Sequence, residues 1–282
     1  MVKVSRSMLK NTIQHWISKL DMLDPDWKKK DFSEFDIVYH VAGLAHADVG
    51  NVDDATKAKY YAVNTDLAVE VCKKAKSEGV KEFIFMSSMI VYGDSAPYGK
   101  DKIIDEHTVP KAANFYGDSK LQADVAVRSF ADDSFKVLVI RPPMIYGKGS
   151  KGNYPTLAKL AKKRSMLHID NLCEFLCQIM LVSDIKENAT VFMPQNAEWT
   201  KTSDMVKKIA DVSGKKIRTL KIFRPAVFIG SKMPGKIGGL INKAFGNSCY
   251  EKELSNYEGI KYQTTSLSES VVGKVILIKS SI

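Results

Sequence analysis

Two kinds of apolar pattern alternate along the first half of the chain. Unbroken apolar runs with β-branched and aromatic residues predict buried strands at residues 36–42, 82–87 and 136–141. Apolar residues at helical spacing lie between these runs and predict helices at residues 55–78 and 114–130, the second with Leu121, Val125 and Phe130 on one side. Strands and helices that alternate at these lengths predict right-handed crossovers and an α/β fold with a doubly wound parallel sheet.

The pattern becomes weaker beyond residue 147. We predict helices at residues 154–163, 171–181 and 202–212, a short segment at 166–169 and a strand at 189–193. Because strand content is low here, residues 1–147 are expected to form a Rossmann-like domain and residues 148–282 a smaller α+β lobe. We expect this lobe to bind the substrate without being fully separate from the first domain.

The composition is that of an ordinary globular protein, with 282 residues of which 45% are hydrophobic and 26% are charged. Residues 1–30 mix apolar and charged positions, so no export signal is expected, and the apolar run at residues 275–278 is too short to span a bilayer. The four cysteines follow neither a disulfide framework nor a zinc-binding pattern. The sequence therefore predicts a cytoplasmic protein with no membrane segment and no metal site.

The net charge of +10 leaves two explanations open. Lysine and arginine residues are spread over many segments rather than gathered in one basic stripe with aromatic residues, which argues against nucleic acid as a partner. The excess of positive charge is either a solvated basic surface or a means of attracting a small anionic substrate.

A tyrosine followed four positions later by a lysine occurs three times. The pairs are Tyr98 with Lys102, Tyr116 with Lys120, and Tyr257 with Lys261. Only the middle pair starts a predicted helix and follows a strand that ends in two serines, Ser87 and Ser88. Residues four apart share one face of a helix, so Tyr116 and Lys120 are expected to point into the same cleft. The alternative is a surface tyrosine beside a solvated lysine.

A serine, a tyrosine and a lysine in this arrangement suit the combined transfer of a proton and a hydride. A tyrosine with its ordinary pKa of about 10 cannot act as a base near neutral pH. An ammonium group one helical turn away favours the phenolate, as the positive ring of an oxidised nicotinamide would. We expect Tyr116 to accept a hydroxyl proton while hydride leaves the same carbon, and Ser88 to hold the reacting oxygen.

Six motifs occur in order between residues 20 and 170. They are Val41-Ala-Gly-Leu-Ala-His46, Asn64-Thr-Asp-Leu67, Phe85-Met-Ser-Ser-Met-Ile-Val-Tyr-Gly93, Tyr116-Gly-Asp-Ser-Lys120, Arg141-Pro-Pro-Met-Ile-Tyr-Gly147 and Arg164-Ser-Met-Leu-His-Ile-Asp170. Together they resemble the extended short-chain dehydrogenases/reductases of the NAD-dependent epimerase/dehydratase family, and UDP-sugar (UDP-glucose) 4-epimerases in particular. The resemblance implies a Rossmann-like fold, NAD as the cofactor, a UDP-sugar as the substrate and a homodimer.

The resemblance also implies which residues bind the cofactor. They are Asp21, Met22, Val41, Ala42, Gly43, Asn64, Tyr116, Lys120, Pro143 and Met144. Val41, Ala42 and Gly43 would pass close to the phosphates and ribose, and Asn64 would stabilise the central helix and the sheet. Pro143 and Met144 would line the nicotinamide.

Other residues are implied in adenine and substrate binding. Asp21 and Met22 match an acidic–aliphatic pair that holds adenine, although a plain turn at a strand end explains them too. Arg164 matches an arginine that binds the substrate pyrophosphate, a role that needs a fixed charged fork, with an ordinary surface arginine as the alternative. The implied substrate-binding residues are Ser88, Tyr116, Met144 and Arg164.

The two residues after Ser88 narrow the range of reactions that the resemblance implies. Sugar-nucleotide dehydratases of this family carry an aspartate and a glutamate at these positions, and decarboxylating relatives use a glutamate at the second. Met89 and Ile90 stand there in this chain and transfer no proton. Oxidation and re-reduction at one carbon remain, which means epimerisation, with C4 of a UDP-hexose as the expected centre, or a one-way reduction by NAD(P)H.

The chain departs from the family at its amino terminus. The family opens with a strand and a glycine-rich turn that holds the cofactor pyrophosphate, whereas the first glycine here is Gly43. The first βαβ unit is therefore expected to be missing, and the Rossmann-like fold to be truncated. This leaves a further hypothesis beside the NAD-dependent 4-epimerase: a non-catalytic member that binds a sugar nucleotide without NAD.

Overall fold

The computed structural model describes residues 20–22, 24–45, 52–147, 163–181, 185, 187–201, 224–234, 246–266 and 269–270. The predicted helix at 202–212 lies outside these residues. So does the predicted helix at 154–163, apart from its last residue, which starts a short strand.

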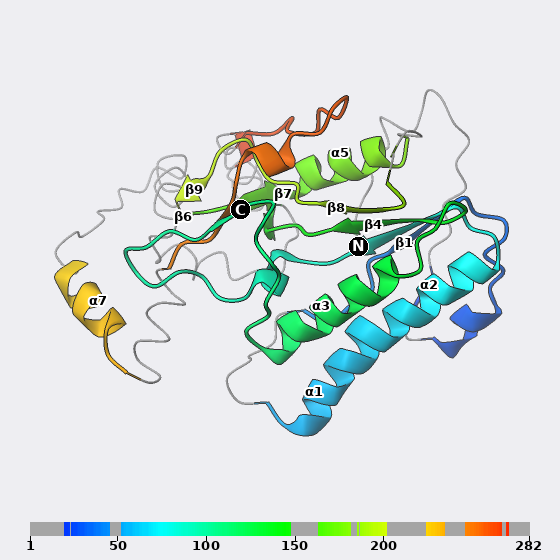
Figure 1. Ribbon diagram of the computed structural model, residues 1–282, viewed down its shortest axis with the longest axis horizontal. Helices are drawn as coiled ribbons and strands as arrows, with labels where there is room; N and C mark the ends of the chain where they lie inside the picture. The colour runs from blue at the N-terminus through cyan, green and yellow to red at the C-terminus, as the bar shows by residue number, and fades with distance from the viewer. Residues whose placement is uncertain are drawn as a thin grey trace, which may run out of the picture. The chain divides into compact units, whose positions relative to one another are not determined.

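Four parallel strands form the main sheet in the order β1-β2-β4-β8 (Figure 1). They are β1 (Ile37–His40), β2 (Glu82–Met86), β4 (Lys136–Ile140) and β8 (Ala189–Phe192). Each strand falls within a predicted one, because a buried parallel strand needs a continuous apolar run that is visible in the sequence. The parallel α/β sheet confirms the predicted fold class. β8 comes from the second half of the chain and pairs with β4.

Helices cover both sides of this sheet (Figure 1). α1 (Asp54–Tyr61), the π-helical turn η2 (Ala62–Asp66) and α2 (Leu67–Ser77) form one continuous stretch beside α3 (Phe115–Arg128). The carboxyl-terminal part of α5 (Ile169–Ile179) lies on the other side of the sheet. The sequence predicted the long stretch as one regular helix and did not show the π-helical turn.

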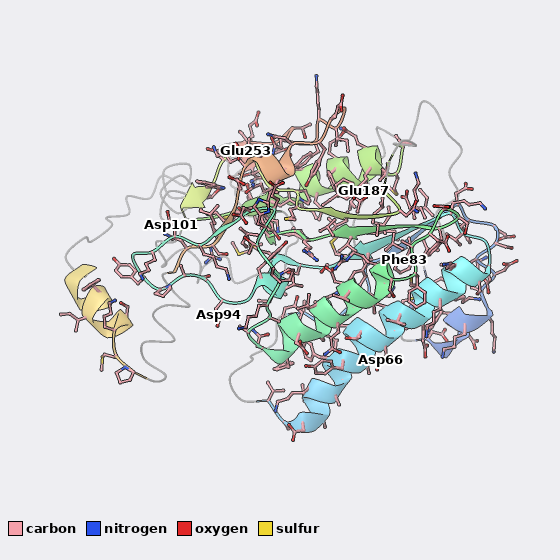
Figure 2. The ribbon with its side chains drawn as sticks, in the orientation of Figure 1. Asp66, Phe83, Asp94, Asp101, Glu187 and Glu253 are labelled. Atoms are coloured by element: carbon pink, nitrogen blue, oxygen red, sulfur yellow. The ribbon has the colours of Figure 1, made fainter. Side chains whose placement is uncertain are left out.

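An apolar core fills the space between α2, α3 and the sheet. Phe83 and Phe85 of β2 and Val137 and Val139 of β4 belong to this core, because alternate residues of a strand face the same side. Phe83 is labelled in Figure 2 and is fully buried. The core fixes α3 against the strand ends where the predicted site lies.

The buried face of α3 is more polar than its sequence suggested. Leu121 and Val125 were expected on the apolar side of this helix, but Val125 is 53% exposed. Lys120 and Asp124 are buried instead, at 6% and 0% exposure. Two ionisable residues one turn apart on a buried face indicate a site rather than a packing surface.

The chain divides into two compact units. The first comprises Met1–Gly93, Pro110–Arg141 and Leu176–Phe192 and contains the main sheet. The second comprises Asp94–Val109, Pro142–Phe175 and Met193–Ile282. The chain therefore crosses between the units more than once, and the single boundary at residue 147 stays a prediction.

The described residues of the second unit form three two-stranded sheets. Their strands are β3 (Ile103–Ile104) with β10 (Cys249–Tyr250), β5 (Met144–Tyr146) with β7 (Met166–His168), and β6 (Lys163–Arg164) with β9 (Thr200–Lys201). This unit also has the helix α7 (Arg224–Ser231) and the 3₁₀ turn η5 (Glu253–Ser255). Two further 3₁₀ turns, η1 (Pro25–Lys29) and η3 (Met89–Tyr92), belong to the first unit. Among the residues described above, no helix is both long and apolar enough to cross a membrane.

Candidate functional site

Ser88 lies two residues beyond the carboxyl end of β2. Its hydroxyl oxygen accepts a hydrogen bond of 3.3 Å from the Ile90 backbone N–H, so Ser88 caps the 3₁₀ turn η3. The side chain is half-buried. The carboxyl ends of parallel strands are where α/β sheets bind ligands, and Ser88 occupies that edge as predicted.

Tyr116 and Lys120 both lie in the amino-terminal half of α3. The helix starts after Asn114, whose side-chain oxygen accepts a 3.0 Å hydrogen bond from the Gly117 N–H. This cap places Tyr116 at the second position of the helix and Lys120 one turn later. The two side chains therefore share a helical face, as their spacing predicted.

Lys120 joins α3 to the strand end that carries Ser88. Its Nζ donates a 3.1 Å hydrogen bond to the Met86 carbonyl and lies 5.1 Å from the centre of the Phe85 ring. Burial lowers the pKa of Lys120 from 10.5 to about 8. A buried lysine with a lowered pKa differs from a solvated surface lysine, which was the alternative explanation for the Tyr116–Lys120 pair.

The surroundings of Tyr116 contain an aromatic residue that the sequence did not indicate. The ring of Tyr60, from α1, meets the Tyr116 ring edge-on with centroids 5.9 Å apart. Burial raises the pKa of Tyr116 above its usual 10, and Tyr60 raises it further. This direction is opposite to the lowering expected from Lys120. Both effects favour the neutral phenol of Tyr116, and added positive charge nearby would oppose them.

The chain after β1 passes very close to Lys120. A Cβ placed on Gly43 would lie 2.9 Å from Lys120 Nζ and 3.0 Å from Asn64 Oδ1. Asn64 holds this segment, because its Oδ1 accepts a 2.7 Å hydrogen bond from the Leu44 N–H and its Nδ2 donates to the Leu44 carbonyl at 3.2 Å. A side chain at position 43 would crowd Lys120 and Asn64, so glycine keeps this approach open.

Asn64 also ties the same segment to α3. Its Nδ2 donates a 3.0 Å hydrogen bond to Ser119 Oγ, and Thr65 Oγ1 donates a 2.7 Å bond to the Ser119 carbonyl. Both residues lie in the π-helical turn, a feature that often marks functional sites. Asn64 thus joins the helices to the end of β1, in line with its predicted stabilising role.

The remaining predicted cofactor residues of the first unit lie at its surface or edge. Val41 is 50% exposed directly after β1, and Ala42 is half-buried. Asp21 is exposed, and its carbonyl accepts a 3.2 Å hydrogen bond from the Asp24 N–H. Met22 packs partly against the apolar core. A turn at Asp21 fits both the adenine-binding and the plain-turn explanation, so the role of this pair stays a prediction.

Pro143, Met144 and Arg164 belong to the second unit. Pro143 is buried just before β5, and Met144 begins that strand opposite Met166 of β7. Arg164 Nη1 lies 3.6 Å from the Met144 sulfur, so two of the predicted substrate-binding residues are in contact. Burial lowers the pKa of Arg164. No partner is found for its buried Nε in the part of the chain that the structure describes, which leaves a cationic fork able to take an anionic ligand.

We expect the stability of the protein to depend on pH through Lys120. Between about pH 8 and 10.5 the unfolded chain keeps the proton that folded Lys120 has released, so the unfolding free energy rises with pH. Relative to Lys120→Met, the wild-type value should increase by about 3 kcal/mol over this window, at roughly 1.4 kcal/mol per pKa unit.

Urea unfolding of both proteins at several pH values measures this difference, and Lys100→Met, at an exposed position, controls for the loss of a charge. A wild-type minus Lys120→Met difference that stays constant from pH 8 to 10.5 would contradict a depressed lysine pKa.

A parallel α/β sheet with a serine beyond one strand and a tyrosine–lysine pair on the next helix defines the short-chain dehydrogenase/reductase class. The chain belongs to the NAD dependent epimerase/dehydratase family, whose model matches residues 2–187. The predicted family is thus confirmed.

Two curated relatives are 4-epimerases. The chain is 30% identical over 188 residues to the UDP-glucose 4-epimerase of Vibrio cholerae, covering 62% of this chain and 56% of that protein. It is 29% identical over 171 residues to the N-acetyl-alpha-D-glucosaminyl-diphospho-ditrans,octacis-undecaprenol 4-epimerase of Escherichia coli O157:H7, covering 55% of this chain and 49% of that protein. The chain spans about half the length of these relatives.

A solved structure shares the fold over nearly the whole chain. The UDP-glucuronic acid 4-epimerase of Bacillus cereus, in complex with UDP-glucuronic acid and NAD, superposes with a TM-score of 0.70 at 17% identity, covering 98% of this chain and 85% of that one. At this identity the likeness shows the Rossmann-like fold.

Proposed function

We propose that this chain contributes to NAD-dependent 4-epimerisation of a nucleotide sugar, with a UDP-hexose as substrate. The observation that carries the proposal is the meeting of Gly43, Asn64 and buried Lys120 beside the strand end that leads to Ser88. A backbone segment without a side chain, next to a lysine donor, suits the ribose of a dinucleotide. These residues therefore fit the ribose of NAD.

Each residue of the site has a distinct task in this proposal. When bound, NAD supplies the acceptor and later the donor of the hydride. Tyr116 takes the proton of the C4 hydroxyl as the hydride leaves C4, and returns it when the hydride adds to the opposite face of the sugar. Ser88 holds the reacting oxygen by a hydrogen bond. Lys120 binds the ribose and, as the ammonium, favours the Tyr116 phenolate against the effect of burial.

The second unit supplies Met144 and Arg164 to substrate binding in the proposal. In the proposal Arg164 pairs with the substrate pyrophosphate, because a guanidinium can form two parallel hydrogen bonds to an anion. Met144 lies against it. The excess positive charge of the chain would raise the local concentration of such a substrate.

Ligand titration followed by thermal unfolding tests the proposal, because a ligand bound only by the folded state raises the melting temperature. We expect NAD and a UDP-sugar each to raise it. The shift with the UDP-sugar should disappear in Arg164→Met and should shrink in Arg164→Lys, which keeps the charge but loses the planar fork. The shift with NAD should persist in both variants.

Two results would contradict parts of this proposal. A shift with the UDP-sugar and none with NAD indicates a member that binds a sugar nucleotide without catalysis. A net consumption of reduced cofactor during turnover indicates a one-way reductase in place of an epimerase. Cytoplasmic location stays a prediction. The homodimer also stays a prediction, and measurement of the molecular mass in solution tests it.

A further inference from the structure

A buried carboxylate lies two turns beyond Tyr116 on the same face of α3. Asp124 is fully buried, and both of its oxygens are occupied. Oδ2 accepts hydrogen bonds from Arg141 Nε and from Ser87 Oγ, each at 2.8 Å. Oδ1 accepts from Arg141 Nη2 at 2.8 Å and from Arg128 Nε at 3.1 Å. Asp124 therefore holds one serine and a two-pronged arginine at the same time.

Arg141 extends the network to the far side of the Ser88 segment. Its remaining terminal nitrogen, Nη1, donates a 2.8 Å hydrogen bond to the Tyr92 hydroxyl, and its guanidinium carbon lies 5.4 Å from the centre of the Tyr92 ring. Arg141 is 5% exposed and Tyr92 4%, so water competes little for these bonds. The arginine thus connects Tyr92 to Asp124 and, through it, to α3.

The two residues held by this network stand on either side of Ser88. Ser87 directly precedes it, and Tyr92 ends the 3₁₀ turn that Ser88 caps. The same segment begins at Met86, whose carbonyl accepts the Lys120 hydrogen bond. Three contacts therefore fix residues 86–92 against the helix that carries the tyrosine and the lysine.

We propose that Asp124 and Arg141 are positioning residues, which act through Ser87 and Tyr92 to hold the Ser88 hydroxyl at a fixed place relative to Tyr116. The proposal rests on the proposed function, since it assigns these residues to the same site. A buried ion pair that served stability alone would not need a serine and a tyrosine from both ends of one loop. A displacement of the Ser88 hydroxyl by about 1 Å would weaken its hydrogen bond to the reacting oxygen.

Two mild variants test the proposal without breaking the ion pair. Ser87→Ala and Tyr92→Phe each remove one hydrogen bond between the network and the Ser88 segment. Tyr61→Phe is the matched control, because Tyr61 donates a hydrogen bond of the same 2.8 Å length to a carboxylate of α3, that of Asp118, outside this network. Amide hydrogen exchange of residues 86–93 should accelerate at least about tenfold in the two test variants and stay unchanged in the control.

Turnover of a UDP-hexose with NAD gives the functional measurement. We expect Tyr92→Phe to lower kcat about tenfold with KM within twofold, because the loop position matters in the transition state. In a Ser88→Ala background the same change should cost less than twofold, since the network then has no serine to position. Tyr61→Phe should keep both constants.

The two measurements separate the proposals. Unchanged exchange of residues 86–93 in both variants overturns the positioning role, whether or not the protein turns over a sugar nucleotide. An equal loss of kcat with and without Ser88 overturns it as well. Accelerated exchange in a protein that turns over no sugar nucleotide supports the hold on the loop and counts against the proposed function.

Discussion

Tyr116→Phe is expected to abolish interconversion of the sugar epimers, with kcat reduced by at least about 10³-fold. A positioned acid–base group contributes about 10²–10⁴-fold to the rate, and phenylalanine has no proton to exchange. The ring itself is kept, so the edge-on contact with Tyr60 at 5.9 Å should persist and the variant should fold. The reaction is followed by coupled detection of the epimer.

A second tyrosine in the chain provides the control for this prediction. Tyr98 also stands four residues before a lysine, Lys102, but it lies in the second unit in a segment without a helix. Tyr98→Phe should therefore leave kcat unchanged. Turnover in Tyr116→Phe above about one hundredth of the wild-type rate, with a melting temperature equal to that of the wild type, would show that another group is the base.

The strands of the main sheet were predictable because each depends on a local pattern. β2 and β4 are apolar at every central position, and such a run suits only a strand buried on both faces. The pairing of β1 with β2 and of β2 with β4 follows the usual rule that strands joined by one helical crossover are neighbours in a parallel sheet. The π-helical turn was not predictable, because Asn64 and Thr65 adopt it to reach Ser119, which is far away in sequence.

The three central site residues were predictable for a different reason. Ser88, Tyr116 and Lys120 are recognised by their order and by the elements that carry them, and the structure places them on those elements. The burial and the Tyr60 contact that raise the pKa of Tyr116 were not predictable, because both depend on tertiary packing. The spacing along α3 predicts that Lys120 lies near Tyr116, but it does not predict which helix packs against Tyr116.

One residue, Asp124, gave a sequence signal for the buried ion pair of Asp124 with Arg141. Asp124 follows Lys120 by four residues, so the sequence places two ionisable groups on a single face of α3. The prediction gave that helix an apolar face through Leu121 and Val125, and the structure shows Val125 largely exposed. An arginine that ends the next strand was the missing partner, and only the sheet brings Arg141 to the helix.

Asp124→Asn is expected to lower the free energy of unfolding by about 3–5 kcal/mol, because it leaves the buried guanidinium of Arg141 without its counter-charge. The substitution keeps the shape of the side chain, so the loss reflects charge rather than a cavity. Asp118→Asn is the control on the same helix. Its carboxylate is half-buried and accepts hydrogen bonds from Tyr61 and Gln122, and its loss should cost under about 1 kcal/mol.

The double variant Asp124→Leu/Arg141→Met decides whether the two groups act as a pair. Removing both charges leaves neither one buried alone, so the double variant should be more stable than Asp124→Asn, by about 2 kcal/mol or more in urea unfolding. If the double variant instead loses the sum of the two single losses, each residue stabilises the protein separately. The loop at Ser88 would then be held by two unrelated bonds, one from Ser87 and one from Tyr92, rather than by one buried charge pair.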